Sequence, residues 1–505
     1  MKDKEEIEML SFEEEPKKPS SQKKPEENKK LTRSSRYESL LEEEEKKEKN
    51  KKKENKKGDK ETLKEEKDMK RSTGKKRKLK KGLGQTIFCL ISFLFMMGCF
   101  IFYGSRAIHY YKIYNPKSSN QEPLATSIMK KASIVYEGSG VYKESGNYLY
   151  KGEKVDNYLR YSNLTWRIVK IANDNTVEIV LDDPINVMAF DKKTTDFNTS
   201  DVSKYLNKEF VKYLDTSKLE KAIVCTDKIS DLSKLSCNDS TIENYVKLPD
   251  ISDFLNSISE DSYLTSSNDS LWLYNHKDAS AVWYSSGYNL STDKPTSYNE
   301  IKPVVTLKST NVLVGGKGTK EDPYRIEKDK NKVQFGSYVK LDGDEWVVYK
   351  EEKDGLRLTL SEVNTSVKTR MFSSKSNEYD PKDSTSLAGY LNSYYYEDIS
   401  YKSLMKEASW YTGSYTSSYK DVYDSEVKAN VGMLNAADFK FGSFSDYYYL
   451  TTPAKGNMIY IYANGLLESD VTSYEYYRPA IMIKKDVTIK SGSGTKTDPY
   501  VLEVK

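Results

Sequence analysis

Two cysteines in the C-terminal part of the chain are spaced for a local disulfide. Cys225 and Cys237 are 12 positions apart, whereas the other two cysteines, Cys89 and Cys99, lie in an apolar segment. An exported pair at this spacing can close a short loop, which stabilises a fold by about 3 kcal/mol. We predict a disulfide between Cys225 and Cys237, with two free thiols as the alternative.

Aromatic side chains are the candidates for ligand binding. Of the 41 tyrosines, 39 follow the apolar segment. Tyrosine and tryptophan supply a large contact area and a polar group with little loss of entropy. Packing in a core is the alternative, and it is our prediction for Trp166 and Trp346, which stand inside strand patterns. The residues that could line a face for glycan or protein are Trp272, Trp283, Tyr284, Trp410, Tyr411, Tyr448 and Tyr449.

Residue types for catalysis or metal binding are sparse. Two histidines in 505 residues argue against multi-histidine zinc sites and most histidine acid–base schemes. No G-x-S-x-G motif stands between a strand and a helix, Ser139 is a turn residue, and His276 is a loop residue. Carboxylates such as Asp182-Asp183 are too numerous to assign as a catalytic pair. We therefore predict no catalytic set and no cofactor.

Calcium-dependent sugar binding also lacks its usual signals. The E-P-N, Q-P-D and W-N-D motifs of calcium-dependent lectins are absent, and the acidic turns at Asn268-Asp269 and Asp342-Asp344 stand alone. Calcium takes roughly six to eight oxygen ligands, which such turns do not provide by themselves. We predict no metal site.

A single uncharged segment predicts a membrane anchor. Residues 82–105 carry no charge, and their apolar part reads TIFCLISFLFMMGCFIFYG. A helix of this length reaches about 36 Å at roughly 1.5 Å per residue, enough for a hydrocarbon core of about 30 Å. Eight basic residues between Lys70 and Lys81 precede it, which places the N-terminus in the cytoplasm and the C-terminal part outside. We predict a retained transmembrane helix at 86–105 and a stalk at 106–133.

The first 85 residues predict a disordered cytoplasmic tail. They contain 29 Lys+Arg and 21 Asp+Glu and almost no aromatic residues. Such a segment cannot bury enough apolar surface to offset its conformational entropy. The basic cluster is explained by topology and contact with anionic lipid, so the bilayer is an expected partner and nucleic acid is not.

The remainder of the chain contains one sequence pattern twice. The Trp166-Arg167-Ile168 and Tyr205-Leu206-Asn207 blocks recur at Trp346 and Tyr390, and GTKEDPY at 318–324 recurs as GTKTDPY at 494–500. Six blocks keep their order at offsets of 176 to 186 positions. A period this long predicts self-contained domains, at 134–327 and 331–505.

Each copy predicts an α+β fold. The runs YLRY, LTWRIVKI and TVEIVL between 158 and 181 alternate as strands do. Residues 201–214 have helical spacing with Asp201 as the expected N-cap, and residues 249–258 predict a second helix. The repeated GTK-x-DPY segments read as a turn before a terminal strand.

The motif order resembles a family of uncharacterised domains in Gram-positive envelope proteins, with the pattern W-R-V, Y-L-N-x-x-F, W-W-L-R-S-P and V-R-P-A. The matching residues include Tyr205-Leu206-Asn207 through Phe210, and Tyr477-Arg478-Pro479-Ala480. The resemblance covers 150–310 and 335–485 and implies folds similar to C-type lectins and sulfatase-modifying factors. Both copies depart from it, since Thr265 or Thr451 replaces the arginine of W-W-L-R-S-P.

These features together predict a single-pass envelope protein that presents two tandem lectin-like domains outside the cell. Its expected role is non-catalytic binding or scaffolding, with a cell-wall glycan, a host glycan or an envelope protein as ligand. The alternatives are an envelope-acting enzyme of the sulfatase-modifying type and a cell-envelope assembly protein. The sequence predicts no oligomeric state.

Overall fold

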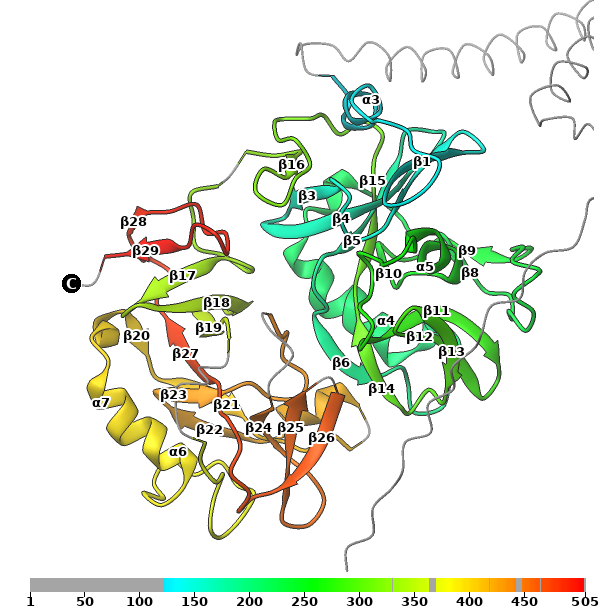
Figure 1. The fold of residues 1–505 in the computed structure, drawn as a ribbon. Helices are drawn as coiled ribbons and strands as arrows, with labels where there is room; N and C mark the ends of the chain where they lie inside the picture. The colour runs from blue at the N-terminus through cyan, green and yellow to red at the C-terminus, as the bar shows by residue number, and fades with distance from the viewer. Residues whose placement is uncertain are drawn as a thin grey trace, which may run out of the picture. The chain divides into compact units, whose positions relative to one another are not determined.

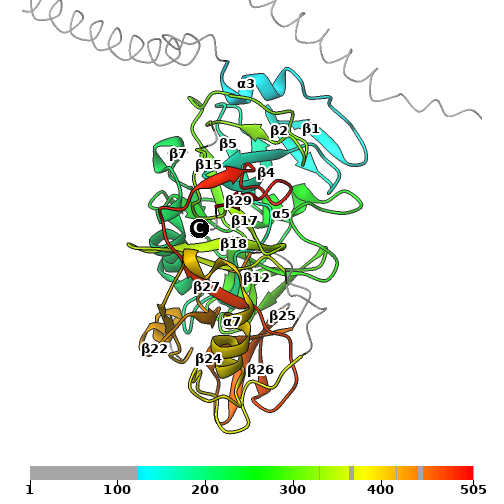
Figure 2. The ribbon, with the colours of Figure 1, turned by 90° about the vertical axis from the view of Figure 1, so that its left-hand side faces the viewer.

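The computed structural model describes residues 122–503, except 329, 363–368, 417, 442–446 and 464. The described chain is a sheet-rich α+β structure with short helices (Figures 1 and 2). The predicted tail, membrane helix and first part of the stalk lie outside the described residues. Among the residues described, no helix is both long and apolar enough to cross a membrane.

The first repeat is built on a nine-stranded sheet. Its main path runs β1-β2-β4-β5-β15-β10, with β3 joined to β4 and β16, and β7 joined to β15. The strands are β1 (Gly140–Glu144), β2 (Asn147–Lys151), β3 (Tyr158–Tyr161), β4 (Leu164–Ile171), β5 (Val177–Leu181), β7 (Leu219–Glu220), β10 (Val246–Lys247), β15 (Val304–Leu307) and β16 (Tyr324–Arg325). Every residue of β5 is buried, as expected for a central strand covered on both faces.

A second sheet of the first repeat has the order β13-β12-β11-β14-β6. Its strands are β6 (Asn186–Ala189), β11 (Ser270–Asp278), β12 (Ala281–Ser286), β13 (Asn289–Asp293) and β14 (Tyr298–Ile301). The helices are α3 (Leu124–Met129), α4 (Asp201–Lys204) and α5 (Ile251–Ser257). Helix α3 falls in the stretch predicted as stalk, but Leu124, Ala125 and Ile128 are buried in the core of the repeat. Its apolar face therefore makes it part of the folded unit.

The second repeat has an eight-stranded sheet of order β20-β27-β19-β18-β17-β29-β28, with β23 joined to β27. Its strands are β17 (Tyr338–Leu341), β18 (Asp344–Glu351), β19 (Leu356–Leu360), β20 (Met405–Lys406), β23 (Val431–Met433), β27 (Pro479–Ile483), β28 (Ile489–Ser491) and β29 (Tyr500–Leu502). The remaining elements are α6 (Leu387–Tyr390), α7 (Tyr396–Asp398), the pair β21 (Ala408–Tyr411) and β22 (Glu426–Ala429), and the sheet of β24 (Tyr448–Pro453), β25 (Met458–Ala463) and β26 (Gly465–Asp470).

The two repeats use the same strand pairings. The terminal strands β16 and β29 pair in parallel with β3 and β17, and β15 and β27 pair with β5 and β19. The Tyr-Leu-Asn motif has one role in both copies. The Asn207 amide donates to the Val246 carbonyl at 2.8 Å and accepts from its N–H at 3.0 Å, and Asn392 makes the same two bonds with Val431. The asparagine thus fixes the helix to strand β10 or β23.

The two repeats pack against each other and share part of one hydrophobic core, whereas the sequence predicts two self-contained domains. The described residues of both repeats fall in one compact unit. Phe439 of the second repeat contacts the rings of Tyr205, Phe210 and Tyr213 of the first, at centroid distances of 5.1 to 5.9 Å. Buried residues of both repeats belong to one hydrophobic cluster. Each copy has an apolar face that is covered by the other copy, because the ring cluster lies where they meet.

Candidate functional site

The structure corrects the predicted aromatic recognition face for five of its seven residues. These five side chains are buried, with exposed fractions between 0% and 7%, and they are Trp272, Trp283, Trp410, Tyr448 and Tyr449. The three indole N–H groups donate to internal carbonyls, at 3.0 Å for Trp272, 2.8 Å for Trp283 and 2.9 Å for Trp410. Buried rings with internal hydrogen bonds are packing residues and do not face a ligand in this conformation.

The other two aromatic candidates are half-buried and lie in different repeats. Tyr284 packs edge-on against Trp272, with ring centroids 6.0 Å apart. Tyr411 packs edge-on against Tyr423 at 4.9 Å, and the Lys350 ammonium lies 5.0 Å from its ring centroid. The seven candidates therefore do not form one surface.

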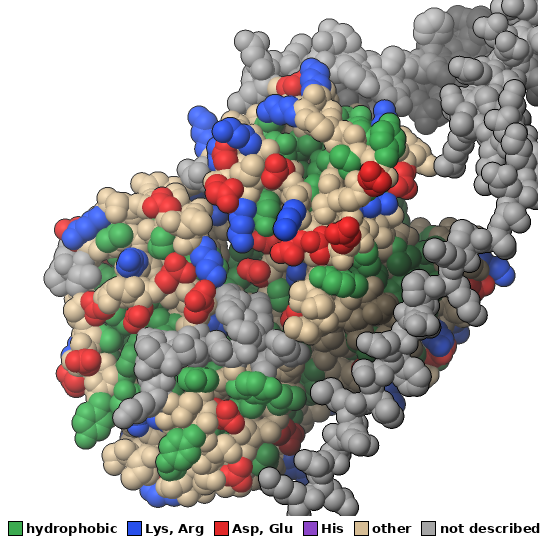
Figure 3. All heavy atoms as spheres, viewed as in Figure 1, with side chains coloured by type: hydrophobic (Ala, Val, Ile, Leu, Met, Phe, Trp, Pro, Cys, Tyr) green, Lys and Arg blue, Asp and Glu red, His purple; other side chains and the backbone are tan. Residues whose placement is uncertain are grey.

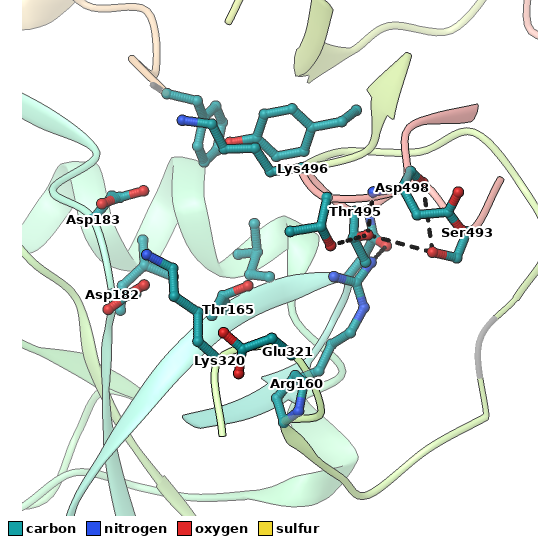
Figure 4. A pocket seen from close by; sticks show the side chains of 18 of the residues that line it. Arg160, Thr165, Asp182, Asp183, Lys320, Glu321, Ser493, Thr495, Lys496 and Asp498 are labelled. Atoms are coloured by element: carbon teal, nitrogen blue, oxygen red, sulfur yellow. Dashed lines mark hydrogen bonds between the residues drawn. The ribbon is translucent and has the colours of Figure 1, made fainter. Parts of the chain in front are cut away.

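The strongest candidate site is a polar cavity of about 410 Å³ between the repeats (Figure 4). Residues of the two GTK-x-DPY loops, one from each repeat, line it together with residues of β3, β4 and the segment after β5. Figure 3 shows acidic and basic side chains mixed over this part of the surface. Its labelled lining residues are Arg160, Thr165, Asp182, Asp183, Lys320, Glu321, Ser493, Thr495, Lys496 and Asp498.

Two glycines fix the matching shape of the loops. Gly318 has φ +87° and Gly494 has φ +74°, a region that other residues rarely adopt. A Cβ at either position would come within 2.4 Å of the ring of the following Tyr324 or Tyr500. The Gly318 carbonyl accepts from the Tyr158 N–H of β3 at 2.8 Å, and the Gly494 carbonyl accepts from the Tyr338 N–H of β17 at 2.9 Å. This geometry holds Lys320 and Lys496 at the cavity.

The electrostatics of the cavity combine both signs of charge. The Asp182 carboxylate lies 3.5 Å from the Arg167 guanidinium. Asp183 is exposed to the cavity, yet the protein around it removes much of its hydration, and this effect together with the like charge of Asp182 raises its pKa. Lys320 and Lys496 oppose this rise. A ligand with hydroxyl, ammonium or carboxylate groups would find a partner for each in this cavity.

Other predicted polar residues have local structural roles. The Asp269 carboxylate accepts from the Ser266 N–H at 2.7 Å within its own turn, and the Asp342 carboxylate accepts from the N–H of the distant Ser400 at 2.8 Å. His276, predicted as a loop residue, lies half-buried in strand β11, and burial lowers its pKa. Asp269 and Asp342 are therefore turn residues and His276 is a strand residue, and none of them belongs to the candidate site.

The structure joins Cys225 and Cys237 in a disulfide, with their Cα atoms 5.8 Å apart. Within the described residues, these cysteines and Asp227 are the group whose ligand atoms are close enough for a metal ion. Both sulfur atoms are taken by the disulfide, so the group does not offer the thiolates that a soft metal prefers.

Sequence reasoning missed the cavity although its signal was present. The GTK-x-DPY segment is the longest matching block of the two copies, and it was interpreted as a turn and a strand. Its lysines, Lys320 and Lys496, are exposed. The turn is formed by the glycine and the backbone, so the recurrence of the lysine was the available signal for a binding role. The meeting of the two loops depends on how the repeats pack, which neither loop encodes by itself.

A scan against protein-family models, a search of curated proteins and a search of solved structures found no match to this chain. The family resemblance based on the motifs stays a prediction.

Proposed function

We propose that the chain is a non-catalytic binding protein of a bacterial envelope, anchored by residues 86–105 with both repeats outside the cell. The repeats would be divergent members of the lectin-like family that their motifs resemble. One observation supports the proposal most: the same loop from each repeat borders one polar cavity, with Lys320 and Lys496 near Asp183. Mixed charge in a concave site is suited to binding a polar ligand.

The ligand class follows from the lining. The cavity is lined by ammonium, guanidinium, carboxylate and hydroxyl groups, and contains few aromatic rings. A cell-wall or host glycan that carries amino and carboxyl groups matches these donors and acceptors. A volume of about 410 Å³ accommodates a short segment of such a glycan and not a folded protein domain.

An array of peptidoglycan fragments and host-type oligosaccharides, probed with the full-length protein, tests this site. Charge reversal in the double variant Lys320→Glu/Lys496→Glu is expected to weaken binding at least tenfold, because both cations are lost from the cavity. Lys485→Glu is the matched control, since Lys485 is exposed and does not line the cavity. Equal binding by the double variant and the control would refute the site, and no glycan bound by the unaltered protein would refute the ligand class.

Location is tested separately. A protease added to intact cells is expected to digest the two repeats and to leave residues 1–85 intact. Repeats that resist digestion until the cells are lysed would contradict the proposed topology.

A further inference from the structure

One of the β-hairpins of the first repeat has a counterpart at the same place in the second repeat. Hairpin β8 (Val224–Cys225) and β9 (Ser240–Thr241) follows β7, and hairpin β21–β22 follows β20. Val224 pairs with Thr241, and Trp410 pairs with Val427, with the same spacing of 186 positions for both strands. Val224 and Trp410 therefore occupy equivalent positions.

In the second repeat the space beneath this hairpin is filled. The Trp410 ring lies against Gly432, where a Cβ would come within 2.0 Å of the ring. The Arg357 guanidinium stacks on the same ring, 4.7 Å from its centroid. An aromatic ring and a cation from the chain itself thus occupy the site.

In the first repeat the same three positions have different residues. By strand register, Lys247 stands where the second repeat has Gly432, and Glu178 stands where it has Arg357. Val224 stands in place of Trp410, and a groove of about 1120 Å³ is open beside Glu178 and Lys247. Glu178, Lys247, Asp250 and Tyr274 line it.

The floor of the groove has more carboxylates than ammonium groups. Lys247 is 3% exposed and lies 3.3 Å from Glu178 and 3.2 Å from Asp253. Lys170 Nζ lies 3.1 Å from Glu178 Oε1, although that oxygen accepts no hydrogen bond of good geometry. Four carboxylates and three ammonium groups line the groove, and they are Asp174, Glu178, Glu220 and Asp250 against Lys170, Lys221 and Lys247. The buried Asp253 carboxylate, which contacts Lys247, adds a fifth negative charge nearby.

The excess of negative charge has a local effect. Burial and the nearby Asp253 carboxylate raise the pKa of Glu178 in spite of the two lysines. The Tyr274 hydroxyl donates to Asp250 at 3.3 Å, and its ring forms one wall of the groove. The chain's own Lys247 ammonium already lies over the Tyr274 ring, 5.4 Å from its centroid. A further cation at the groove would reduce the repulsion among the carboxylates.

The hairpin also exposes apolar side chains beside the charged floor. Ile223 is 60% exposed and Ile242 is 56% exposed, and both line the groove. Leu232 and Leu235 in the same hairpin are 40% and 38% exposed. The Cys225–Cys237 disulfide holds these residues in place. Exposed apolar side chains that are bordered by polar groups mark interaction surfaces of proteins.

We propose that this groove is a docking site for a basic segment of a partner protein, in which a lysine or arginine side chain lies between apolar residues. The cation would enter beside Glu178, Asp250 and Tyr274, and the apolar residues would cover Ile223 and Ile242. The second repeat satisfies the equivalent space with its own Trp410 and Arg357. This site is separate from the polar cavity and does not depend on the function proposed for it.

Fluorescence anisotropy with the full-length protein tests the proposal. The probes are a fluorescein-labelled peptide KWLRIK and its acidic counterpart EWLEIE. The basic peptide is expected to bind at least tenfold more tightly, and added salt is expected to weaken its binding. Equal affinities for the two peptides, or no binding of the basic one, would overturn the proposal.

Groove variants locate the binding. Glu220→Lys and Ile223→Ser change exposed residues of the groove and leave the buried ion pairs intact, so the fold is retained. Each is expected to weaken binding of KWLRIK at least fivefold. Glu362→Lys is the control, because Glu362 is exposed and pairs with Lys496 beside the other cavity. Binding that is unchanged by the groove variants, or is weakened equally by the control, would contradict the site.

Discussion

At the scale of single residues, several buried polar side chains are structural parts of the fold. Arg478 of the Arg-Pro motif donates to the carbonyls of Leu360, Ser361 and Phe441 and is 1% exposed. Lys440 is fully buried, and its ammonium group lies within 3.2 Å of four acceptors. One acceptor is Asn186 of the first repeat, so Lys440 connects the two copies.

Lys440 gives the stability of the protein a specific pH dependence. Burial lowers the pKa of Lys440 to about 7, below its ordinary value of roughly 10.4 in an unfolded chain. Between these values the unfolded state binds more protons than the folded state, so stability rises with pH. Relative to Lys440→Met, the free energy of unfolding of the unaltered protein is expected to increase by about 2 kcal/mol from pH 7 to pH 9.

Urea denaturation followed by tryptophan fluorescence at pH 6, 7, 8 and 9 measures this difference. The buried tyrosines around Lys440, Tyr205 and Tyr462, have pKa values raised well above the ordinary range and do not titrate in this window. The difference between the two proteins should level off toward pH 6, where Lys440 becomes protonated in the folded as well as in the unfolded state. Parallel curves throughout the range would exclude the titration of Lys440.

Residue roles could be predicted from the sequence only in part. Core packing of Trp166 and Trp346 was predicted from their strand patterns, and both are fully buried. Trp272 and Trp410 are binding candidates in the sequence, because the pattern of a short strand does not show which side chains point into the core. Asn207 and Asn392 were recognised as a motif, but their bonds to β10 and β23 join segments 39 positions apart. Such contacts are absent from a local pattern.

At the scale of elements, the space beneath the equivalent hairpins contains different side chains in the two repeats. Gly432→Ala is expected to destabilise the protein by about 1–3 kcal/mol, because the added methyl group would overlap the Trp410 ring. The same change in a Trp410→Ala background is expected to cost much less, since the overlapping ring is absent. Thermal unfolding of the two single variants and the double variant gives the coupling.

Gly465→Ala is the control for this cycle, because nothing lies within 4 Å of a Cβ at Gly465. Equal destabilisation at Gly432 with and without the Trp410 ring would show that backbone effects, and not the ring contact, require glycine there.

Elements were predicted well where the apolar pattern is regular. The three predicted strand runs correspond to β3, β4 and β5. The predicted helix at 201–214 is instead a short α-helix followed by a wider π turn at Tyr205–Glu209 and a tighter 3-10 turn at Phe210–Tyr213. Its N-cap is Ser200, whose hydroxyl accepts from the Ser203 N–H, and not Asp201. The periodicity marks the buried face, whereas the change of turn depends on tertiary contacts of that face.

At the scale of the whole described chain, the shared ring cluster predicts cooperative unfolding of both repeats. Calorimetry is expected to show one transition for residues 122–503. Phe439→Ala is expected to cost about 3–5 kcal/mol and to split the transition, because Phe439 contacts rings of both repeats.

The control is Phe372→Ala, because Phe372 is buried in the cluster that belongs to the second repeat alone. It should lower the transition temperature without splitting the peak. Two separate transitions in the unaltered protein would contradict a common core. The duplication was evident from the sequence, but the shared core was not. A repeated apolar pattern looks the same whether the apolar face of each copy is buried within that copy or against the other copy.

The shared ring cluster limits what can be removed from this chain. A fragment that ended at Lys328, or one that began at Lys332, would leave Tyr213 or Phe335 without the partner on which it stacks at 3.8 Å. Such a fragment would expose part of its hydrophobic core to solvent and would tend to aggregate. Recombination between the two similar gene segments, which would delete one copy, should therefore yield an insoluble product rather than a shorter working protein.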